Sequence, residues 1–219
     1  MLLSTFIRDG IARLERLYPS PEARGLVLML CAEKLGTTSY THVIEPQTAV
    51  PEERLEELES DLRRLCSGEP IQYVLGVAEF CGHRFAVGPG VLVPRPETEL
   101  LVARAVSLLQ EMDLDRAPRV LDLCTGSGCI AIALAKHFAN AEVVAFDVSE
   151  AALALAKENA ENNGAKVQFV CDDVLNPTSD YFNRSVDLVV SNPPYVCDCE
   201  RAAMEANVLD WEPETALFV

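Results

Sequence analysis

The second half of the sequence repeats one pattern, a short apolar strand followed by a turn and a helix. The first repeat reads RVLDL, CTGSG and CIAIALAKHF over residues 119–138. The second reads EVVAFD and SEAALALAKENAENNG over residues 142–164, and the apolar runs KVQFV and VDLVVS follow it. Continuous apolar strands that alternate with helices are typical of a parallel sheet covered on both faces. The sequence therefore predicts an α/β fold with a doubly wound, Rossmann-like domain over residues 96–219.

The front of the chain has a different character. An apolar stripe at helical spacing predicts a helix over residues 2–18, and a proline near the start with a glycine at the end predicts two more over 20–36 and 51–68. We expect residues 1–70 to form a small helical domain. Short β-like runs broken by glycines and prolines then predict a β-hairpin linker over residues 71–95.

Composition narrows the classes of function. The formal net charge is −16, which argues against a protein that grips nucleic acid directly, although the charge could serve solubility alone. No apolar run approaches the ~20 residues of a membrane span. The eight cysteines are scattered and no signal peptide precedes them, so we expect reduced thiols in a cytoplasmic protein. Cys197 and Cys199 are too close together and too isolated to predict a zinc site, and no other metal site is expected.

A glycine loop is the first candidate binding site. DLCTGSG follows a predicted strand and opens a predicted helix, where unpaired N–H groups can meet a ligand. Asp147 ends the next strand, where an open α/β sheet places a carboxylate on a ribose diol. Together they indicate a nucleoside cofactor, but they do not distinguish a dinucleotide from S-adenosylmethionine.

The second candidate site is the corner Asn-Pro-Pro-Tyr, which follows the fourth strand. In a doubly wound sheet it would lie beside the glycine loop. The Asn192 side-chain oxygen and the Pro193 carbonyl could accept the two hydrogens of a planar NH₂ group, and Tyr195 could stack on that group. Such a corner indicates methyl transfer to an amide or amino nitrogen. The alternative is that it is only a structural turn formed by the two prolines.

The chain resembles the release-factor glutamine N5-methyltransferases, the HemK/PrmC family. The resemblance rests on five segments in order: GEPIQYVLGVAEFCGHRFAVGPGVLVPRPETELLV, VLDLCTGSGCIAIALA, FDVSEAALALAKENAENNG, VSNPPY and EPETALF. It implies a methyltransferase that uses S-adenosylmethionine and a peptide chain release factor as its protein substrate, with glutamine of the Gly-Gly-Gln motif as acceptor. The helical front would dock that substrate, and we expect a monomer.

The resemblance also implies which residues act. Catalysis would fall to Asn192, Pro193 and Tyr195, and the substrate would contact these and Pro194. The cofactor contacts would be Cys124, Thr125, Gly126, Ser127, Gly128, Asp147, Asp173 and Asn192. Cys124 stands where the family usually has glycine, so a positive φ there would strain it. The segment PRPETE, residues 94–99, would close over the cofactor or simply begin a helix.

Three other functions remain as alternatives. A ribosomal-protein glutamine methyltransferase usually differs where this chain has PRPETE. A nucleic-acid adenine methyltransferase would use the same Asn-Pro-Pro-Tyr motif to bind its acceptor NH₂ group, but it would need a basic surface to bind nucleic acid. An inactive binding module would keep the fold without transfer. We also expect that the terminal strands of the family fold are absent, because only four strands are recognisable before Val219.

Overall fold

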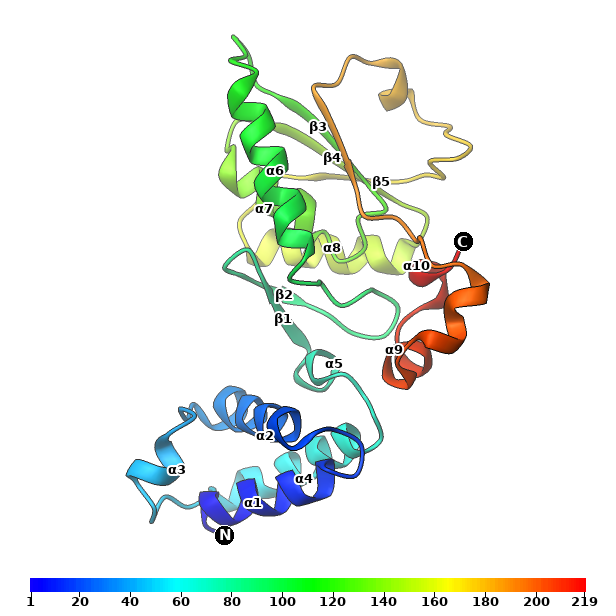
Figure 1. Cartoon of the computed structure of the whole chain (residues 1–219). Coiled ribbons are helices and arrows are strands. Elements are labelled where there is room, and N and C mark those ends of the chain that lie inside the picture. The colour runs from blue at the N-terminus through cyan, green and yellow to red at the C-terminus, as the bar shows by residue number, and fades with distance from the viewer. The chain divides into compact units, whose positions relative to one another are not determined.

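A computed structural model describes residues 1–219, except for the side chains of Asn183 and Ala206. The chain forms two compact units (Figure 1). The helical unit comprises residues 1–75 and returns to include 206–211, and the sheet unit comprises residues 76–205 and 212–219.

The helical unit is a bundle with its own apolar core. Its described helices are α1 (Leu3–Leu14), α2 (Ser20–Leu35), α3 (Thr41–Ile44), α4 (Glu52–Cys66), α5 (Ile71–Leu75) and α9 (Ala206–Trp211). Phe6, Leu30 and Leu58 are almost completely buried between them. Gly36 caps the C-terminal end of α2 with a φ of 65°, a left-handed conformation that glycine adopts at little cost. Trp211 of α9 lies against Gly68.

Helix α5 differs from the sequence-based expectation of β-like structure from residue 71. The segment IQYVL forms a helical turn because the amides of Tyr73 and Val74 donate to the carbonyl oxygen of Pro70, at 2.9 and 3.1 Å. Arg64 supports the turn, since its guanidinium donates to the carbonyl oxygens of Tyr73 and Val74. The sequence analysis missed this helix because β-branched and aromatic residues such as those in IQYVL are typical of strands.

The sheet unit begins with a hairpin and continues with the alternating pattern. Its elements are β1 (Val77–Phe80), β2 (His83–Ala86), α6 (Thr98–Glu111), β3 (Arg119–Leu123), α7 (Cys129–His137), β4 (Glu142–Asp147), α8 (Glu150–Asn162), β5 (Gln168–Cys171), η1 (Asp180–Asn183), β6 (Leu188–Ser191), η2 (Asp198–Ala203) and α10 (Glu214–Leu217). Strands β1 and β2 pair antiparallel across Cys81 and Gly82. Both turn residues have positive φ, as the tight hairpin turns that match strand twist require.

The four-stranded sheet has the order β5-β4-β3-β6 and is parallel throughout. The chain moves outward from β3 through β4 to β5 and then returns to the other side of β3 with β6. This reversal is the topological switch of doubly wound sheets, and ligands bind outside the carboxyl ends of the strands at that point. The predicted α/β fold with a parallel sheet is confirmed.

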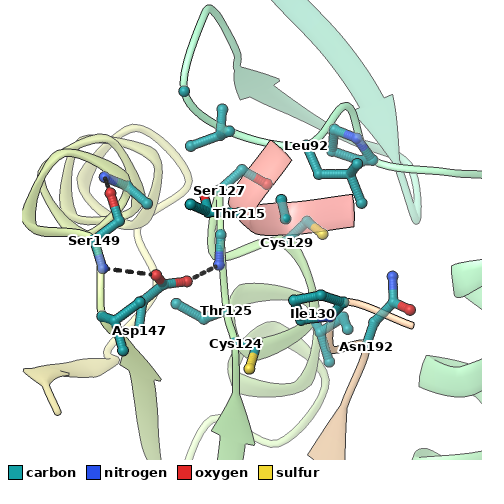
Figure 2. Close-up of a pocket in the computed structure, with 18 of the residues that line it drawn as sticks. Leu92, Cys124, Thr125, Ser127, Cys129, Ile130, Asp147, Ser149, Asn192 and Thr215 are labelled. Atoms are coloured by element: carbon teal, nitrogen blue, oxygen red, sulfur yellow. Dashed lines mark hydrogen bonds between the residues drawn. The ribbon is translucent and has the colours of Figure 1, made fainter. Parts of the chain in front are cut away.

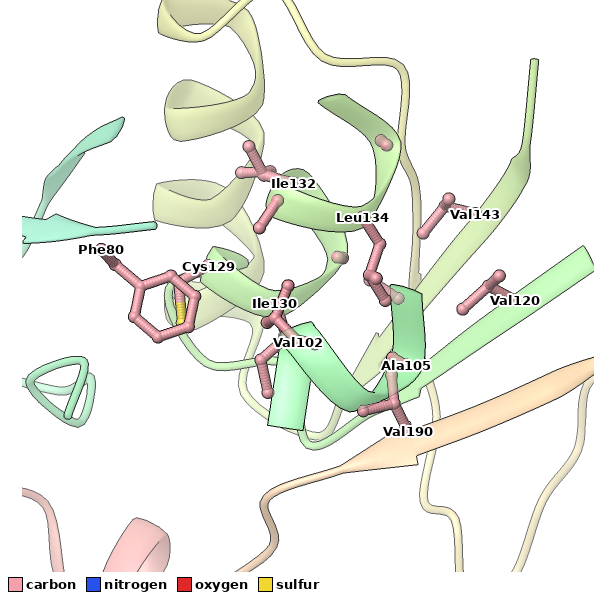
Figure 3. Close-up of a cluster of buried hydrophobic side chains, with 14 of the residues drawn as sticks. Phe80, Val102, Ala105, Val120, Cys129, Ile130, Ile132, Leu134, Val143 and Val190 are labelled. Atoms are coloured by element: carbon pink, nitrogen blue, oxygen red, sulfur yellow. The ribbon is translucent and has the colours of Figure 1, made fainter. Parts of the chain in front are cut away.

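The two faces of the sheet carry different layers. Helices α6, α7 and α8 cover one face, where Val120, Val143 and Val190 pack against Ile132 and Leu134 (Figure 3). On the other face, Leu121, Val144 and Phe146 pack against the segment around η1. The ring of Phe146 lies 4.9 Å from that of Phe182, centroid to centroid. Both faces of the central strands β3 and β4 are therefore buried, which explains their apolar sequence, whereas Val189 of the edge strand β6 is 51% exposed.

Candidate functional site

A pocket lies at the carboxyl ends of β3, β4 and β6, at the topological switch. It holds about 930 Å³ of empty space, part of it open to solvent. Six parts of the sheet unit line it: the segment between the hairpin and α6, the glycine loop with the start of α7, the end of β4 with the start of α8, the segment after β5, the corner after β6, and helix α10. A concave site with mostly apolar walls and a few polar groups is typical of a cofactor pocket.

The glycine loop joins β3 to α7 with three residues in the left-handed region. The φ angles are 61° at Cys124, 56° at Gly126 and 81° at Gly128. A cysteine in this region is strained by ~1–2 kcal/mol relative to glycine. The sequence-based concern about Cys124 is therefore correct, and the fold tolerates the strain.

Asp147 holds the loop from the end of β4 (Figure 2). Its Oδ2 accepts a hydrogen bond from the Gly126 amide at 2.8 Å, and its Oδ1 accepts one from the Ser149 amide at 2.9 Å. Ser149 in turn caps α8, because its Oγ accepts from the Ala152 amide at 3.2 Å. The carboxylate thus links the glycine loop to the start of the next helix, and it lines the pocket.

Asp122 lies beneath the loop and is completely buried. Its Oδ2 accepts hydrogen bonds from Thr125 Oγ1 at 2.6 Å and from the Ala131 amide at 3.2 Å. Its Oδ1 has no hydrogen-bond partner among the described atoms. Burial, which removes the carboxylate from water, raises the pKa of Asp122 to about 7 despite these two bonds.

The corner after β6 borders the same pocket from the other side of β3. In Figure 2, Asn192 and Asp147 lie on opposite sides of the glycine loop. The corner is anchored at both ends: Ser191 Oγ donates to the Leu123 carbonyl oxygen at 2.8 Å, and the Val196 amide donates to the Leu217 carbonyl oxygen at 2.9 Å. Asn192 and Pro194 line the pocket.

Comparisons with known proteins cover nearly the whole chain. The family described as PrmC N-terminal domain matches residues 5–76, and the family described as Methyltransferase small domain matches residues 103–209. A release factor glutamine methyltransferase of Bacteroides thetaiotaomicron is 45% identical over 217 residues, which are 99% of this chain and 75% of that protein. One from Flavobacterium psychrophilum is 42% identical over 219 residues, 100% of this chain and 76% of that protein. The chain belongs to the release factor glutamine methyltransferase family.

Similar solved structures include the T. thermophilus 16S rRNA N2 G1207 methyltransferase in complex with AdoMet and guanosine. It is 29% identical, with a TM-score of 0.44, over 55% of this chain and 32% of that one. Membership of the release factor glutamine methyltransferase family confirms the predicted family and the prediction of an S-adenosylmethionine-dependent methyltransferase. No helix in the described part of the chain is long and apolar enough to cross a membrane.

The structure brings most of the predicted site residues of this family member together. The pocket is lined by seven of them: Cys124, Thr125, Gly126, Ser127, Asp147, Asn192 and Pro194. Gly128 lies away from the lining, and a Cβ there would come within 3.0 Å of the Ala156 Cβ, so this glycine permits close packing of α7 on α8. Pro193 and Tyr195 are also outside the lining, and Tyr195 is 72% exposed.

Asp173 is placed differently from its neighbour Asp172. Asp172 lines the pocket, whereas Asp173 turns to the following loop and accepts from the Leu175 amide and Asn176 Nδ2. Burial acts to raise the pKa of Asp172, but hydrogen bonds from Ser179 and Thr178 outweigh it and lower that pKa to about 2. The carboxylate that lines the pocket is therefore one residue earlier in the chain than predicted. The sequence alone does not indicate which of two adjacent aspartates faces the pocket.

Three further residues were not predicted. Asn159 of α8 is completely buried and binds the backbone of Ala86 in both directions and the Ser127 carbonyl oxygen, which joins the hairpin to the glycine loop. Glu212 accepts from the Val93 amide and from Arg95. Glu99 accepts from the Cys81 amide at 2.7 Å. Glu212 lies in EPETALF and Glu99 lies in PRPETE. The sequence analysis therefore identified both motifs but did not predict which groups these two carboxylates bind.

Two thiols, those of Cys124 and Cys129, line the pocket. Burial raises the pKa of Cys129 to about 12 and also raises that of Cys124, so both remain protonated at neutral pH and neither is an activated nucleophile. Among the described residues, no group of three or more His, Cys, Asp or Glu side chains could hold a metal ion.

Proposed function

We propose that this chain transfers the methyl group of S-adenosylmethionine to the side-chain amide nitrogen, N5, of the glutamine in the Gly-Gly-Gln motif of peptide chain release factors. One observation supports this most directly. Asn192 and Pro194 line the same pocket as the glycine loop and Asp147, so the acceptor corner and the nucleoside-binding loop share one site. The relatives' name supplies the class of substrate.

The residues of the pocket fit this cofactor. Asp147 ends β4, where a carboxylate meets a ribose diol in doubly wound sheets, and the loop and the start of α7 offer backbone N–H groups. When bound, S-adenosylmethionine supplies a methyl group on a positively charged sulfur. Asp147 and the loop at Cys124 to Gly128 would hold its nucleoside part, together with Asp172 from the neighbouring strand end.

The corner would prepare the acceptor nitrogen. The lone pair of an amide nitrogen is delocalised into its carbonyl group, so the nitrogen is a poor nucleophile. In our proposal, Asn192 Oδ1 and the Pro193 carbonyl oxygen accept the two amide hydrogens and orient the nitrogen toward the methyl group. Tyr195, which is exposed beside them, stacks on the flat glutamine amide. The corner thus acts by positioning and preorganised dipoles, without a strong base.

The helical unit would hold the protein substrate. Tyr40, Val43 and Ile44 are 68%, 64% and 74% exposed around helix α3, an unusual set of large apolar side chains on a surface. We propose that residues 1–70 dock the release factor and take no part in the chemistry.

Mass spectrometry of a release factor incubated with the protein and S-adenosylmethionine tests the reaction. We expect the mass of one CH₂ group on the glutamine of Gly-Gly-Gln. Asn192→Ala should lower the single-turnover rate by about 10²–10³-fold, the effect of losing one preorganised polar contact. The matched control is Asn176→Ala, which removes an exposed amide outside the pocket lining.

Two results would contradict the proposal. Methylation of a ribosomal protein or of DNA adenine, with the release factor unchanged, would assign a different acceptor. A near-normal rate for Asn192→Ala would show that the corner is only a turn.

A further inference from the structure

Two of the eight cysteines form a pair that the proposed function does not use. Cys197 and Cys199 are separated by one residue, and both are exposed just beyond the Asn-Pro-Pro-Tyr corner. The buried thiols differ, because burial raises the pKa of Cys31 and Cys129 to about 12 and keeps them protonated. Oxidation requires access and thiolate character, so the exposed pair is more open to it than the buried thiols.

The spacing of the pair allows the two sulfurs to bond. Residues i and i+2 lie at most about 7 Å apart at Cα even in an extended chain, and disulfides span Cα distances of about 4.4–6.8 Å. Cys197 is extended, with φ of −79° and ψ of 148°, and Cys199 lies in the first turn of η2, which shortens the separation. Cys171, the third exposed cysteine, instead donates from its Sγ to the Val148 carbonyl oxygen at 3.7 Å.

Cys197 also holds the start of η2. Its Sγ accepts from the Glu200 amide, and its own amide donates to Glu200 Oε2 at 3.0 Å, which makes a reciprocal capping box. A bond between the sulfurs of Cys197 and Cys199 closes a small ring over three residues. Because the Cys197 sulfur then points toward Cys199, it no longer accepts from the Glu200 amide, and half of the cap is lost.

Helix η2 is joined to one wall of the pocket through Arg201. Arg201 Nη1 donates to Glu214 Oε1 at 2.6 Å, and the guanidinium lies 4.0 Å over the ring of Phe218. Glu214 begins α10, and Thr215 and Ala216 of this helix line the pocket. A loosened η2 therefore weakens the support of a pocket wall.

The backbone next to the pair is bonded to the same segment. Val196 lies between Tyr195 and Cys197. Its amide donates to the Leu217 carbonyl oxygen at 2.9 Å, and its carbonyl oxygen accepts from the Val219 amide at 3.1 Å. A change of backbone at Cys197 thus reaches the acceptor corner on one side and the segment after α10 on the other.

We propose that Cys197 and Cys199 are a redox-sensitive modification site, at which a reversible disulfide loosens η2 and slows methyl transfer at the corner. The oxidant is a small disulfide such as oxidised glutathione. One cysteine attacks it and releases one glutathione thiol, and the other cysteine then displaces the second glutathione from the mixed disulfide. The two protons and two electrons of the pair pass to the two glutathione molecules, and excess reduced glutathione reverses both steps. The effect on methyl transfer rests on the proposed function, whereas the disulfide does not.

Mass spectrometry of the full chain in mixtures of reduced and oxidised glutathione tests the site. We expect a loss of about 2 Da, the mass of two hydrogens, with Cys197 and Cys199 both protected from alkylation. Cys171 is the control within the same chain. It is exposed but has no second cysteine one residue away, so it should form at most a mixed disulfide that carries the mass of a glutathione.

Variants connect the disulfide to activity. The double variant Cys197→Ser, Cys199→Ser removes both sulfurs and keeps a capping oxygen, so its rate should match that of reduced wild type. Oxidation should slow single-turnover methyl transfer by wild type about tenfold or more, because small displacements of positioned groups lower rates steeply. The double variant should not respond, whereas the matched control Cys171→Ser should respond as wild type does.

Hydrogen exchange gives a readout that is independent of methyl transfer. Oxidation should speed exchange of the Val196 and Val219 amides by about fivefold or more, the effect of losing a helix cap. The Gly126 amide, which is bonded to Asp147 in the glycine loop, should exchange at an unchanged rate.

Three results would overturn the inference: no disulfide between the pair, a disulfide that leaves rate and exchange unchanged, or equal slowing of the double variant. A failure of the proposed function is distinct, because the reduced wild-type protein would then leave the release factor unmethylated. The mass and exchange measurements would still decide whether the pair oxidises and loosens η2.

Discussion

Asp122 offers a test of how the floor of the glycine loop contributes to stability. Asp122→Asn keeps the shape of the side chain. The amide oxygen can accept from Thr125 Oγ1 and the Ala131 amide as Oδ2 does now, and the NH₂ group takes the place of Oδ1, which has no partner among the described atoms. Only the ability to ionise is removed, so the variant isolates the electrostatic cost of a buried carboxylate.

The sign and size of the effect follow from the pKa. Burial raises the pKa of Asp122 in the folded protein from 3.8 to about 7, so the folded state holds the proton more tightly than the unfolded state. The stability gained from this proton is complete below pH 4 and is lost as the pH rises through 7. Between pH 5 and pH 8 the loss is about 2.5 kcal/mol, and Asp122→Asn should escape it.

Urea denaturation followed by circular dichroism at pH 5, 6, 7 and 8 would measure this. The free energy of unfolding of the variant, relative to wild type, should rise by about 2–3 kcal/mol across the series. Asp187→Asn is the control: hydrogen bonds from Arg116 and the Arg119 amide lower the pKa of Asp187 from 3.8, so its stabilisation is lost only below about pH 4. Its free energy of unfolding relative to wild type should therefore stay constant from pH 5 to pH 8. Parallel profiles for wild type and Asp122→Asn would refute the reasoning.

Three further predictions concern the loop, the cofactor and the substrate. Asp147→Ala should weaken S-adenosylmethionine by about 1.5–3 kcal/mol, because one change removes the carboxylate from the pocket and from the Gly126 amide; unchanged affinity in calorimetry would exclude Asp147 from the site. Cys124→Gly should raise the free energy of unfolding by about 0.5–1 kcal/mol, since relief of the left-handed strain exceeds the added flexibility of the unfolded chain; a lower melting temperature would contradict this. Ile44→Glu should raise KM for an intact release factor by at least about tenfold while leaving KM for a short glutamine peptide unchanged, and equal effects on both would reject docking through α3.

The sequence predicted the architecture because the relevant signals are local. Unbroken apolar strands, the cap at Ser149 and the left-handed stop at Gly164 each lie within a few residues of the structure that they specify. The same holds for the glycine loop and for Asp147, whose place at the end of β4 follows from the fold.

The parts that escaped prediction depend on distant partners or on a shift of one residue. Glu212 binds Arg95 across 117 positions, and Asn159 binds Ala86 across 73. No local pattern encodes such pairs. Asp172 and Asp173 are chemically identical, and only the path of the chain after β5 decides which of them faces the pocket. The raised pKa of Asp122 is equally invisible in sequence, because it arises from complete burial.

The return of the chain to the helical unit at α9 affects how the protein can be made and divided. Residues 206–211 belong to a unit whose other members all precede residue 76, so the first unit to emerge during synthesis is completed only after most of the sheet unit has been made. Its early helices must wait for some 130 later residues before Trp211 can pack against Gly68. For the same reason, no single cut in the chain yields both units intact. A fragment that starts at Gly76 carries an orphaned helix, and a fragment that ends at Leu75 exposes the surface that α9 covers.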